Sequence, residues 1–386
     1  MQVSIVSTYP PQRCGIGTYT ARLSRALANE GNSSVTVLSE RGALDVRDGP
    51  VRSVVTFRRE DDYVQAIVRK AVEVRADVVH VQHSPDIFGM DARMPLLLSR
   101  LKACGIRSVV TLHTVHTTCS GAIERRFRVA SFHRKLGEAA DALVVHGQHT
   151  MADELVEQGV PRSKISTIAH GTTDLATVDR EAARHQLGLP IDGPVLLYFG
   201  FIHPQKNVHT ILLAFRPLIR RVPNCRLYLA GSVQNPIFTN RVYRNTLRWL
   251  IHGQGLGDHV VFREEYVPAE EAPVLYGAAD LVLLPYAQRY GSASGIVHDA
   301  FGAGKVPLCS RSPKFAEVGV AIDSQLLIST HSPRAWADAI ADLLGNPVRL
   351  ARLRTRVQQY AAKTSWGCVA EQHRTLYERI LSVPCA

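Results

Sequence analysis

One stretch decides the fold class: Leu281-Val282-Leu283-Leu284-Pro285, followed by Tyr290-Gly291-Ser292-Ala293-Ser294-Gly295-Ile296-Val297-His298-Asp299-Ala300. It predicts a buried strand, then a turn of glycine and serine, then a helix of small residues. Free backbone N–H groups at such a helix start, with the positive end of its dipole, can hold a phosphate group. Asp299 follows about one turn later, where a carboxylate can accept hydrogen bonds from a ribose. The stretch indicates a nucleotide-diphosphate site, although such turns also serve plain strand-to-helix packing.

Short β-branched runs alternate with helical patterns along the whole chain. This alternation predicts an α/β fold with parallel sheets that helices cover on both faces. The expected strands of the first half are Val3–Ser7, Ser34–Leu38, Arg52–Phe57, Asp77–Val81, Ser108–Leu112, Ala142–Val145 and Lys164–Ile168, with helices such as Thr18–Ala28, Tyr63–Val74 and Gly147–Glu157. Those of the second half are Val195–Phe199, Arg226–Leu229, His259–Phe262, Leu281–Leu284 and Val306–Ser310.

The length of 386 residues exceeds what one hydrophobic core usually supports, so we expect two domains. A polar stretch at Asp179–Gly193 is the expected boundary. We predict one doubly wound, Rossmann-like domain over residues 1–185 and another over 186–365. A last helix over 366–386 can pack on either domain, the N-terminal one included. Ligands of such sheets bind at the carboxyl ends of the strands.

The composition is that of a globular protein, with 46% hydrophobic and 20% charged residues. The N-terminus has no basic leader, and no apolar run is long enough to span a bilayer, which predicts a cytoplasmic protein. The seven cysteines lack paired spacing and are expected to be reduced thiols.

Histidines are abundant, and three pairs share one spacing: His80/His83, His113/His116 and His146/His149. No carboxylate stands at metal-site spacing beside them, so we predict no metal site and no cofactor.

A net charge of +11 indicates an anionic partner. The basic segment Glu124–Lys135 follows the loop of His113 and can dock on anionic lipid, peripheral to the inner face of a membrane. Solvated arginine-rich helix faces explain the charge equally well. A nucleic-acid partner has no base-stacking motif behind it.

The loop after the first strand contains Gly15 and Gly17, which let backbone approach a ligand at a helix start. A nicotinamide fingerprint needs a third glycine where this chain has Thr20, and an acid at the end of the second strand. Glu40 can be that acid, so this loop alone leaves an NAD-dependent oxidoreductase open.

Two further loops follow strands. Gly200-Phe201-Ile202-His203-Pro204-Gln205-Lys206-Asn207 follows the first strand of the second block, and Lys206 is expected to open a helix there. A cation at that place is unfavourable unless an anion compensates it or solvent surrounds it. His113 stands at the carboxyl end of the strand Ser108–Leu112. There it can donate a hydrogen bond to a ligand or accept one from it, or it can be a structural histidine with partners inside the protein.

Together these loops resemble retaining glycosyltransferases of family 4, which have the GT-B architecture: two Rossmann-like domains facing each other across a cleft. The resemblance covers essentially the full length, and the order of its landmarks is more specific than any one of them. They are Tyr9–Tyr19, Val110–His113, Ile168–Gly171, Tyr198–Asn207, Leu229–Ser232, Tyr276–Asp280 and Ser294–Pro307.

The resemblance implies a role for each loop. Lys206 would neutralise the donor diphosphate, beside Gly200 and Phe201, and His113 would contact the sugar. Asp299 would hold the ribose. Backbone N–H groups around Ser294, Gly295 and Ile296 would add hydrogen bonds to the diphosphate. The Gly15–Gly17 loop would face the donor and the acceptor. The base of the nucleotide would lie between Gly231-Ser232 and the loop of Tyr266 and Val267.

Two departures from the family pattern stand out. The family carries two glutamates in the stretch that opened this section, for which this chain has Gly291 and Asp299. The usual arginine beside the phosphate-binding lysine is Phe201. A subgroup with a Gly-Phe-Ile loop and a Ser-Gly turn is the nearer match. The sugar contact of the first glutamate must therefore come from elsewhere.

The predicted function is transfer of a hexose from a UDP or GDP sugar to a hydroxyl acceptor, with retention and without a metal. A lipid-linked glycan and a small metabolite are the two expected acceptors. Two other classes stay open: a catalytically silent sugar-nucleotide-binding protein, favoured by Gly291, and an NAD-dependent oxidoreductase.

Overall fold

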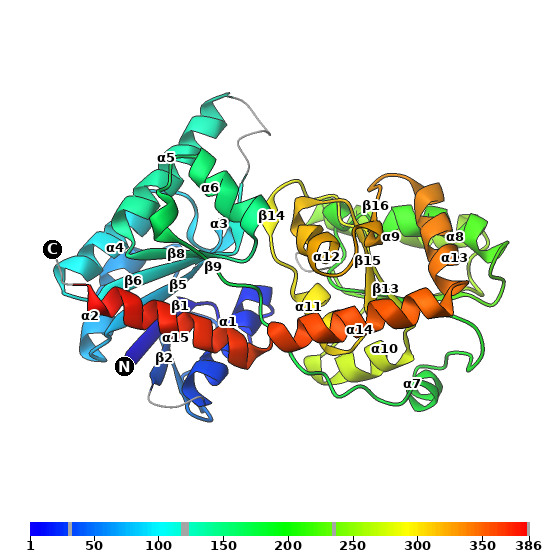
Figure 1. Cartoon of the computed structure of the whole chain (residues 1–386), viewed down its shortest axis with the longest axis horizontal. Helices are drawn as coiled ribbons and strands as arrows, with labels where there is room; N and C mark the ends of the chain where they lie inside the picture. Colours follow the sequence, from blue (N-terminus) through cyan, green and yellow to red (C-terminus); the bar gives the residue numbers. More distant parts are fainter. Residues whose placement is uncertain (30–32, 117–122, 234–236, 384–386) are drawn as a thin grey trace. The chain divides into compact units, whose positions relative to one another are not determined.

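The computed structural model describes residues 1–29, 33–116, 123–233 and 237–383, and it divides into two compact units (Figure 1). The N-terminal unit comprises Met1–Gly171, Tyr290–Gly295 and Thr364–Ala386, and the C-terminal unit comprises Thr172–Arg289 and Ile296–Lys363. The chain first passes from the N-terminal to the C-terminal unit between residues 171 and 172, where the sequence suggested 185 and 186. It returns for the last time between residues 363 and 364, where the sequence suggested 365 and 366. The short return of Tyr290–Gly295 to the N-terminal unit has no counterpart in the sequence prediction.

The N-terminal unit is built on a sheet in the order β3-β4-β2-β1-β5-β6-β8-β9. All neighbours run parallel except the short β3, which is antiparallel to β4. The order turns back at β1, which pairs with both β2 and β5. The strands are β1 (Gln2–Ser7), β2 (Ser34–Glu40), β3 (Val46–Asp48), β4 (Val51–Phe57), β5 (Val78–His83), β6 (Arg107–Leu112), β8 (Ala142–Val145) and β9 (Ile165–Thr167).

Helices cover both faces of this sheet because alternate residues of its strands are apolar on each side. On one face, the core includes Ile67 of α2 (Tyr63–Glu73), Leu97 of α4 (Arg93–Ala103) and Leu136 of α5 (Ile123–Ala139). On the other, it includes Leu23 of α1 (Gly15–Asn29) and Tyr377 of α15 (Trp366–Ser382). The last helix, drawn in red in Figure 1, therefore packs on the N-terminal unit, against α1.

The C-terminal unit is built on a parallel sheet in the order β12-β11-β10-β13-β15-β16. Its order turns back at β10, between β11 and β13. The strands are β10 (Val195–Phe199), β11 (Arg226–Ala230), β12 (Val260–Arg263), β13 (Leu281–Leu284), β15 (Val306–Ser310) and β16 (Leu327–Ile328). Its helices are α7 (Arg180–Gln186), α8 (Val208–Ile219), α9 (Phe238–Gly253), α10 (Ala272–Ala278), α11 (Gly295–Gly302), α12 (Ala316–Ala321), α13 (Pro333–Leu344) and α14 (Pro347–Lys363).

The doubly wound α/β prediction is confirmed, and each long strand forms where it was expected. The strands that the sequence did not indicate are short: β3, β7 (Thr114–Val115), β14 (Gly291–Ser292) and β16. Runs of two or three residues are too short for a pattern of alternation. The segment expected as one helix over Gly147–Glu157 is a short π-helix, Gln148–Ala152, followed by α6 (Asp153–Glu157).

The five described cysteines, Cys14, Cys104, Cys225, Cys309 and Cys368, are free thiols; Cys119 and Cys385 lie outside the described residues. In the described part of the chain, every helix is too short or too polar to cross a bilayer.

Buried histidines join α15 to the sheet of the N-terminal unit. His80 of β5 shares hydrogen bonds with the Tyr377 hydroxyl at 2.6 Å and with Thr111 at 2.7 Å, and its ring lies beside that of His373. Burial lowers the pKa of His373 to about 4 and moves the pKa of His80 in the same direction. Both rings are therefore neutral in the folded protein near pH 7.

The N-terminal unit is expected to lose stability between about pH 6.5 and pH 4. In this window the unfolded chain binds protons on these histidines, whose unfolded pKa is about 6.5, and the folded chain does not. A pKa of about 4 at His373 implies a loss of about 3 kcal/mol by pH 4. Urea unfolding across this range should show a smaller acid loss in His373→Leu than in the wild type. An equal loss in both proteins would contradict the assignment to this residue.

Candidate active site

A tight loop follows β10 in the C-terminal unit. The N–H of Gly200 donates to the carbonyl of Ala230 at 3.0 Å, and the N–H of Ile202 donates to the carbonyl of Ser232 at 2.9 Å. Gly200 has a φ of +139°, which side-chain-bearing residues rarely adopt. A Cβ on Gly231 would lie 1.8 Å from the carbonyl oxygen of Gly200. The loop therefore lies flat against the end of β11 only because residue 231 is glycine.

Lys206 lies at the end of this loop, and backbone hydrogen bonds fix its position. It closes a 3₁₀ turn, Pro204–Lys206, and Asn207 follows in the left-handed region with a φ of +54°. The Asn207 amide donates to the carbonyls of Pro285 at 3.0 Å and Thr330 at 2.8 Å. The prediction that Lys206 opens the helix is wrong, because the turn ends there and α8 begins at Val208.

The Lys206 ammonium lies over the ring of Tyr286, 3.6 Å from its centroid, at the carboxyl end of β13. Within the described part of the chain, no carboxylate forms an ion pair with it. Burial, and then the neighbouring Lys314, lower the pKa of Lys206 well below its ordinary value. A cation that has no compensating carboxylate among the described residues is suited to receive an anion.

The turn before α11 returns to the N-terminal unit and pairs with it. There β14 runs antiparallel to β7, with Gly291 opposite Val115 and Ser292 opposite Thr114. A Cβ on Gly291 would lie 2.2 Å from the carbonyl oxygen of Thr150. Side chains therefore do not fit at position 291, which gives a physical reason why the glutamate of the family pattern is missing.

The helix after this turn begins at Gly295, as the sequence indicates, and carries Ile296 and Asp299. Asp299 is half-buried. The next residue toward the N-terminus, His298, is buried and bonded to the Thr172 hydroxyl at 2.7 Å and to Glu317 at 3.2 Å. These contacts anchor the part of α11 that lies in the C-terminal unit.

His113 directly follows β6 in the N-terminal unit, at the strand end where it was predicted, and two side chains orient its ring. Its Nε2 lies 2.9 Å from Oε1 of Gln82, and its Nδ1 lies 3.3 Å from Nε2 of His146. The ring of Tyr19 packs edge-on at 4.8 Å. Tyr19 belongs to α1, so His113 contacts the helix that Gly15 begins.

The two glycines of the first loop serve different purposes. A Cβ on Gly17 would lie 3.3 Å from the Thr8 hydroxyl, so Gly17 allows close packing of α1 against the chain after β1. A Cβ on Gly15 would meet nothing within 4 Å, which leaves the helix start open on that side.

Glu40, the acid that the dinucleotide hypothesis requires, is engaged within the protein. It is only 4% exposed, and Arg59 binds both of its oxygens at 2.5 Å, while Gln12 reaches it at 3.5 Å. A ribose would have to displace the partly buried ion pair of Glu40 and Arg59, which argues against an NAD site at this loop.

The expected base-binding loop follows β12. Tyr266 is 39% exposed and Val267 is buried. The C-terminal unit thus contains Gly200, Phe201, Lys206, Gly231, Ser232, Tyr266, Val267, Ile296 and Asp299, and the N-terminal unit contains Gly15, Gly17, His113, Ser294 and Gly295.

Comparisons with known proteins divide the chain at nearly the same place, although they assign Ser294 and Gly295 to the second half. The model of the glycosyl transferase 4-like domain matches residues 14–171, and the model of glycosyl transferases group 1 matches residues 179–364. Both halves of the chain are glycosyltransferase domains. The site residues of the C-terminal unit belong to the group 1 domain.

The sequence relatives of this chain include D-inositol 3-phosphate glycosyltransferases. That of Corynebacterium efficiens is 27% identical over 71% of this chain and 66% of the relative, and that of Thermobispora bispora is 30% identical over 72% and 66%. D-inositol 3-phosphate glycosyltransferase 2 of Catenulispora acidiphila is 26% identical over 95% and 90%. The matched part is thus just under two thirds of the length of the first two relatives.

Solved structures show the GT-B fold. Sucrose-phosphate synthase from Thermosynechococcus elongatus has a TM-score of 0.76 at 20% identity and covers 99% of both chains. Anabaena Alr3699/HepE in complex with UDP also has a TM-score of 0.76, at 16% identity, covering 98% of this chain and 100% of that one.

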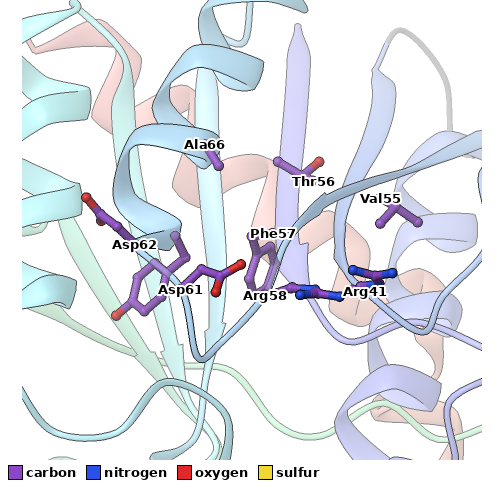
Figure 2. Close-up of a pocket in the computed structure, with 9 residues that line it drawn as sticks. Arg41, Val55, Thr56, Phe57, Arg58, Asp61, Asp62 and Ala66 are labelled. Carbon is purple, nitrogen blue, oxygen red and sulfur yellow. The ribbon is translucent and has the colours of Figure 1, made fainter.

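A cavity of about 260 Å³ lies apart from the predicted site residues, beside β4 of the N-terminal unit (Figure 2). Arg41, Arg58, Asp61 and Asp62 line it together with Val55, Thr56, Phe57, Tyr63 and Ala66. Its wall contains charges of both signs and none of the loops described above. Groups of histidine, cysteine, aspartate and glutamate that could hold a metal are also absent from the described residues.

The sequence did not indicate Tyr286 or Lys314 as site residues. Tyr286 follows the carboxyl end of β13, and Lys314 follows that of β15. Since parallel sheets bind ligands at the carboxyl ends of their strands, these positions could have been identified from the sequence.

Proposed function

We propose that the protein is a retaining glycosyltransferase that moves a hexose from a UDP or GDP sugar to a hydroxyl acceptor. The observation that carries the proposal is the Lys206 ammonium, which is fixed by a tight loop at the carboxyl edge of the sheet and has no paired carboxylate among the described residues. A donor diphosphate supplies the missing negative charge.

The chemistry follows from charge. Breaking the bond between sugar and nucleotide places negative charge on the leaving diphosphate and positive charge on the sugar ring. Lys206 stabilises the leaving group, and because its position is set before the reaction, little reorganisation is required. The leaving phosphate accepts the proton of the acceptor hydroxyl, and the new bond forms on the face from which the phosphate departs.

The other residues bind rather than react in this proposal. Asp299 accepts hydrogen bonds from the ribose, and the base lies at Gly231-Ser232 and Tyr266. Backbone N–H groups of the turn at Ser294 add hydrogen bonds to the diphosphate. His113, oriented by Gln82 and His146, contacts the sugar.

For the acceptor we propose a small hydroxyl compound that carries a negative charge. The net charge of +11 and the relatives named for D-inositol 3-phosphate support this choice over a lipid-linked glycan. Peripheral membrane contact through residues 124–135 stays a separate proposal, since the side chains of Glu124, Arg125 and Arg126 lie outside the described residues.

A thermal-shift screen with UDP, GDP, ADP and NAD tests the function and identifies the base. A ligand present at about 100 times its Kd adds about 2.7 kcal/mol of stability, so one nucleoside diphosphate should raise the Tm by several degrees. NAD should leave the Tm unchanged. A shift with NAD alone would support the oxidoreductase instead.

A catalytically silent binding protein is the second candidate, favoured by the contact of Gly291 with the Thr150 carbonyl, which excludes a glutamate side chain. The two candidates differ in turnover. Slow release of hexose from the matching nucleotide sugar, measured with purified protein, supports the enzyme, whereas binding without any release supports the silent protein.

A further inference from the structure

Lys314 lies on a second loop that meets Tyr286 in the C-terminal unit. It belongs to the 3₁₀ turn Pro313–Phe315, which follows β15 as the loop of Lys206 follows β10. Both loops therefore leave the sheet at its carboxyl edge, where open parallel sheets bind their ligands.

Three contacts hold the turn of Lys314 against the chain that carries Tyr286. The Ser312 hydroxyl donates to the carbonyl of Gln288 at 2.5 Å, and the Ser310 hydroxyl donates to the carbonyl of Tyr286. The Phe315 ring packs on the Tyr286 ring with 5.1 Å between centroids. Since Lys206 lies over this same ring, Tyr286 joins the two lysine-bearing loops.

Lys314 contributes to the electrostatic surroundings of Lys206. Repulsion from Lys314 adds to burial in lowering the pKa of Lys206, and burial lowers the pKa of Lys314 to about 8. Burial, and then Lys206 and Lys314, lower the pKa of His203 to about 4. Holding like charges together in a half-buried place costs folding free energy, which a bound anion offsets.

The carboxylate closest in sequence, Glu317, acts on Lys314 and on other groups as well. It contacts Nε2 of the buried His298 at 3.2 Å and accepts from the Tyr360 hydroxyl at 3.3 Å. The negative charge of Glu317 raises the pKa of Lys314, but burial lowers it by more, so the pKa still lies below its ordinary value. Its charge is therefore shared among several neighbours.

We propose that Lys314 is a second phosphate-binding cation, which grips the terminal phosphate of a nucleoside diphosphate together with Lys206, whose ammonium lies over the ring of Tyr286. This inference rests on the proposed function and adds a residue to the same site. Position 201 is phenylalanine and offers no second cation beside Lys206. A diphosphate carries more negative charge than one ammonium balances, so two cations fit it better than one.

Isothermal titration of the wild type, Lys314→Gln and Lys314→Arg with UDP, UMP and uridine, and with the guanosine series, tests the proposal. In Lys314→Gln, the Kd for the diphosphate should rise roughly 10- to 100-fold, which is the effect of losing one charged hydrogen bond. The monophosphate should lose less affinity and the nucleoside none. Lys314→Arg should recover most of the affinity for the diphosphate.

The matched control is Lys102→Gln, which removes a lysine from the last turn of α4 in the N-terminal unit. It should bind every ligand as the wild type does. If Lys314→Gln keeps its Tm and binds the diphosphate within about twofold of wild type, the inference is wrong while the proposed function stands. If it loses affinity for the nucleoside equally, its role is structural and the inference is again wrong. Failure of the wild type to bind any nucleoside diphosphate would overturn both proposals.

Discussion

Lys206→Ala is expected to reduce kcat/KM for the nucleotide sugar by roughly 10²- to 10³-fold, which is the usual effect of removing one preorganised group that stabilises a developing negative charge. The expected loss lies mainly in kcat, because the charge on the diphosphate grows as the bond to the sugar breaks. Release of nucleoside diphosphate, measured in a coupled assay over a range of donor concentrations, separates kcat from KM.

One control variant and one stability measurement complete that experiment. Lys102→Ala removes an equal charge from the end of α4 and should leave both constants unchanged. Lys206→Ala should also keep the wild-type Tm or raise it, since it removes a half-buried cation with a lowered pKa. An unchanged turnover number in Lys206→Ala would show that this lysine does not serve the leaving group.

Gly231→Ala is expected to lower both stability and activity. The new Cβ would lie 1.8 Å from the Gly200 carbonyl oxygen, so the loop that carries Lys206 must move away from β11. The hydrogen bonds of Gly200 and Ile202 to this strand would lengthen or break. We expect about 2–3 kcal/mol of destabilisation, or roughly 5–10 °C in Tm, and a loss of kcat larger than 10-fold.

Gly257→Ala is the matched control, because a Cβ at Gly257 meets nothing within 4 Å. Its Tm and kcat should stay close to those of the wild type. Both quantities are measured at a temperature where Gly231→Ala is still folded, so that lost activity is not merely unfolding. A Gly231→Ala protein with wild-type Tm and kcat would mean that the loop adapts without cost.

The sequence was sufficient to predict the sheets because their central strands are unbroken apolar runs. Val195–Phe199 and Leu281–Leu284 are buried along nearly their whole length, and such runs between turn residues permit few alternatives. The loops after these strands were found by the same reasoning, since glycine at positions 200 and 295 marks close backbone turns.

Other features depend on contacts between distant residues, which a single sequence does not reveal. Gly291 is explained by the carbonyl of Thr150, and β14 forms only because β7 pairs with it. The position of Lys206 before α8, rather than within it, depends on Asn207 bonding to Pro285 and Thr330. Lys314 becomes a candidate only when Tyr286 is seen to join its loop to that of Lys206.

The most direct test of the central claim is a crystal structure of the wild type with the nucleoside diphosphate that gives the largest thermal shift. The account predicts the diphosphate at the carboxyl edge of the β10–β13 sheet, with Nζ of Lys206 about 2.8 Å from a phosphate oxygen. A nucleotide bound elsewhere, or a diphosphate that leaves the Lys206 ammonium on the Tyr286 ring without touching it, would contradict the account.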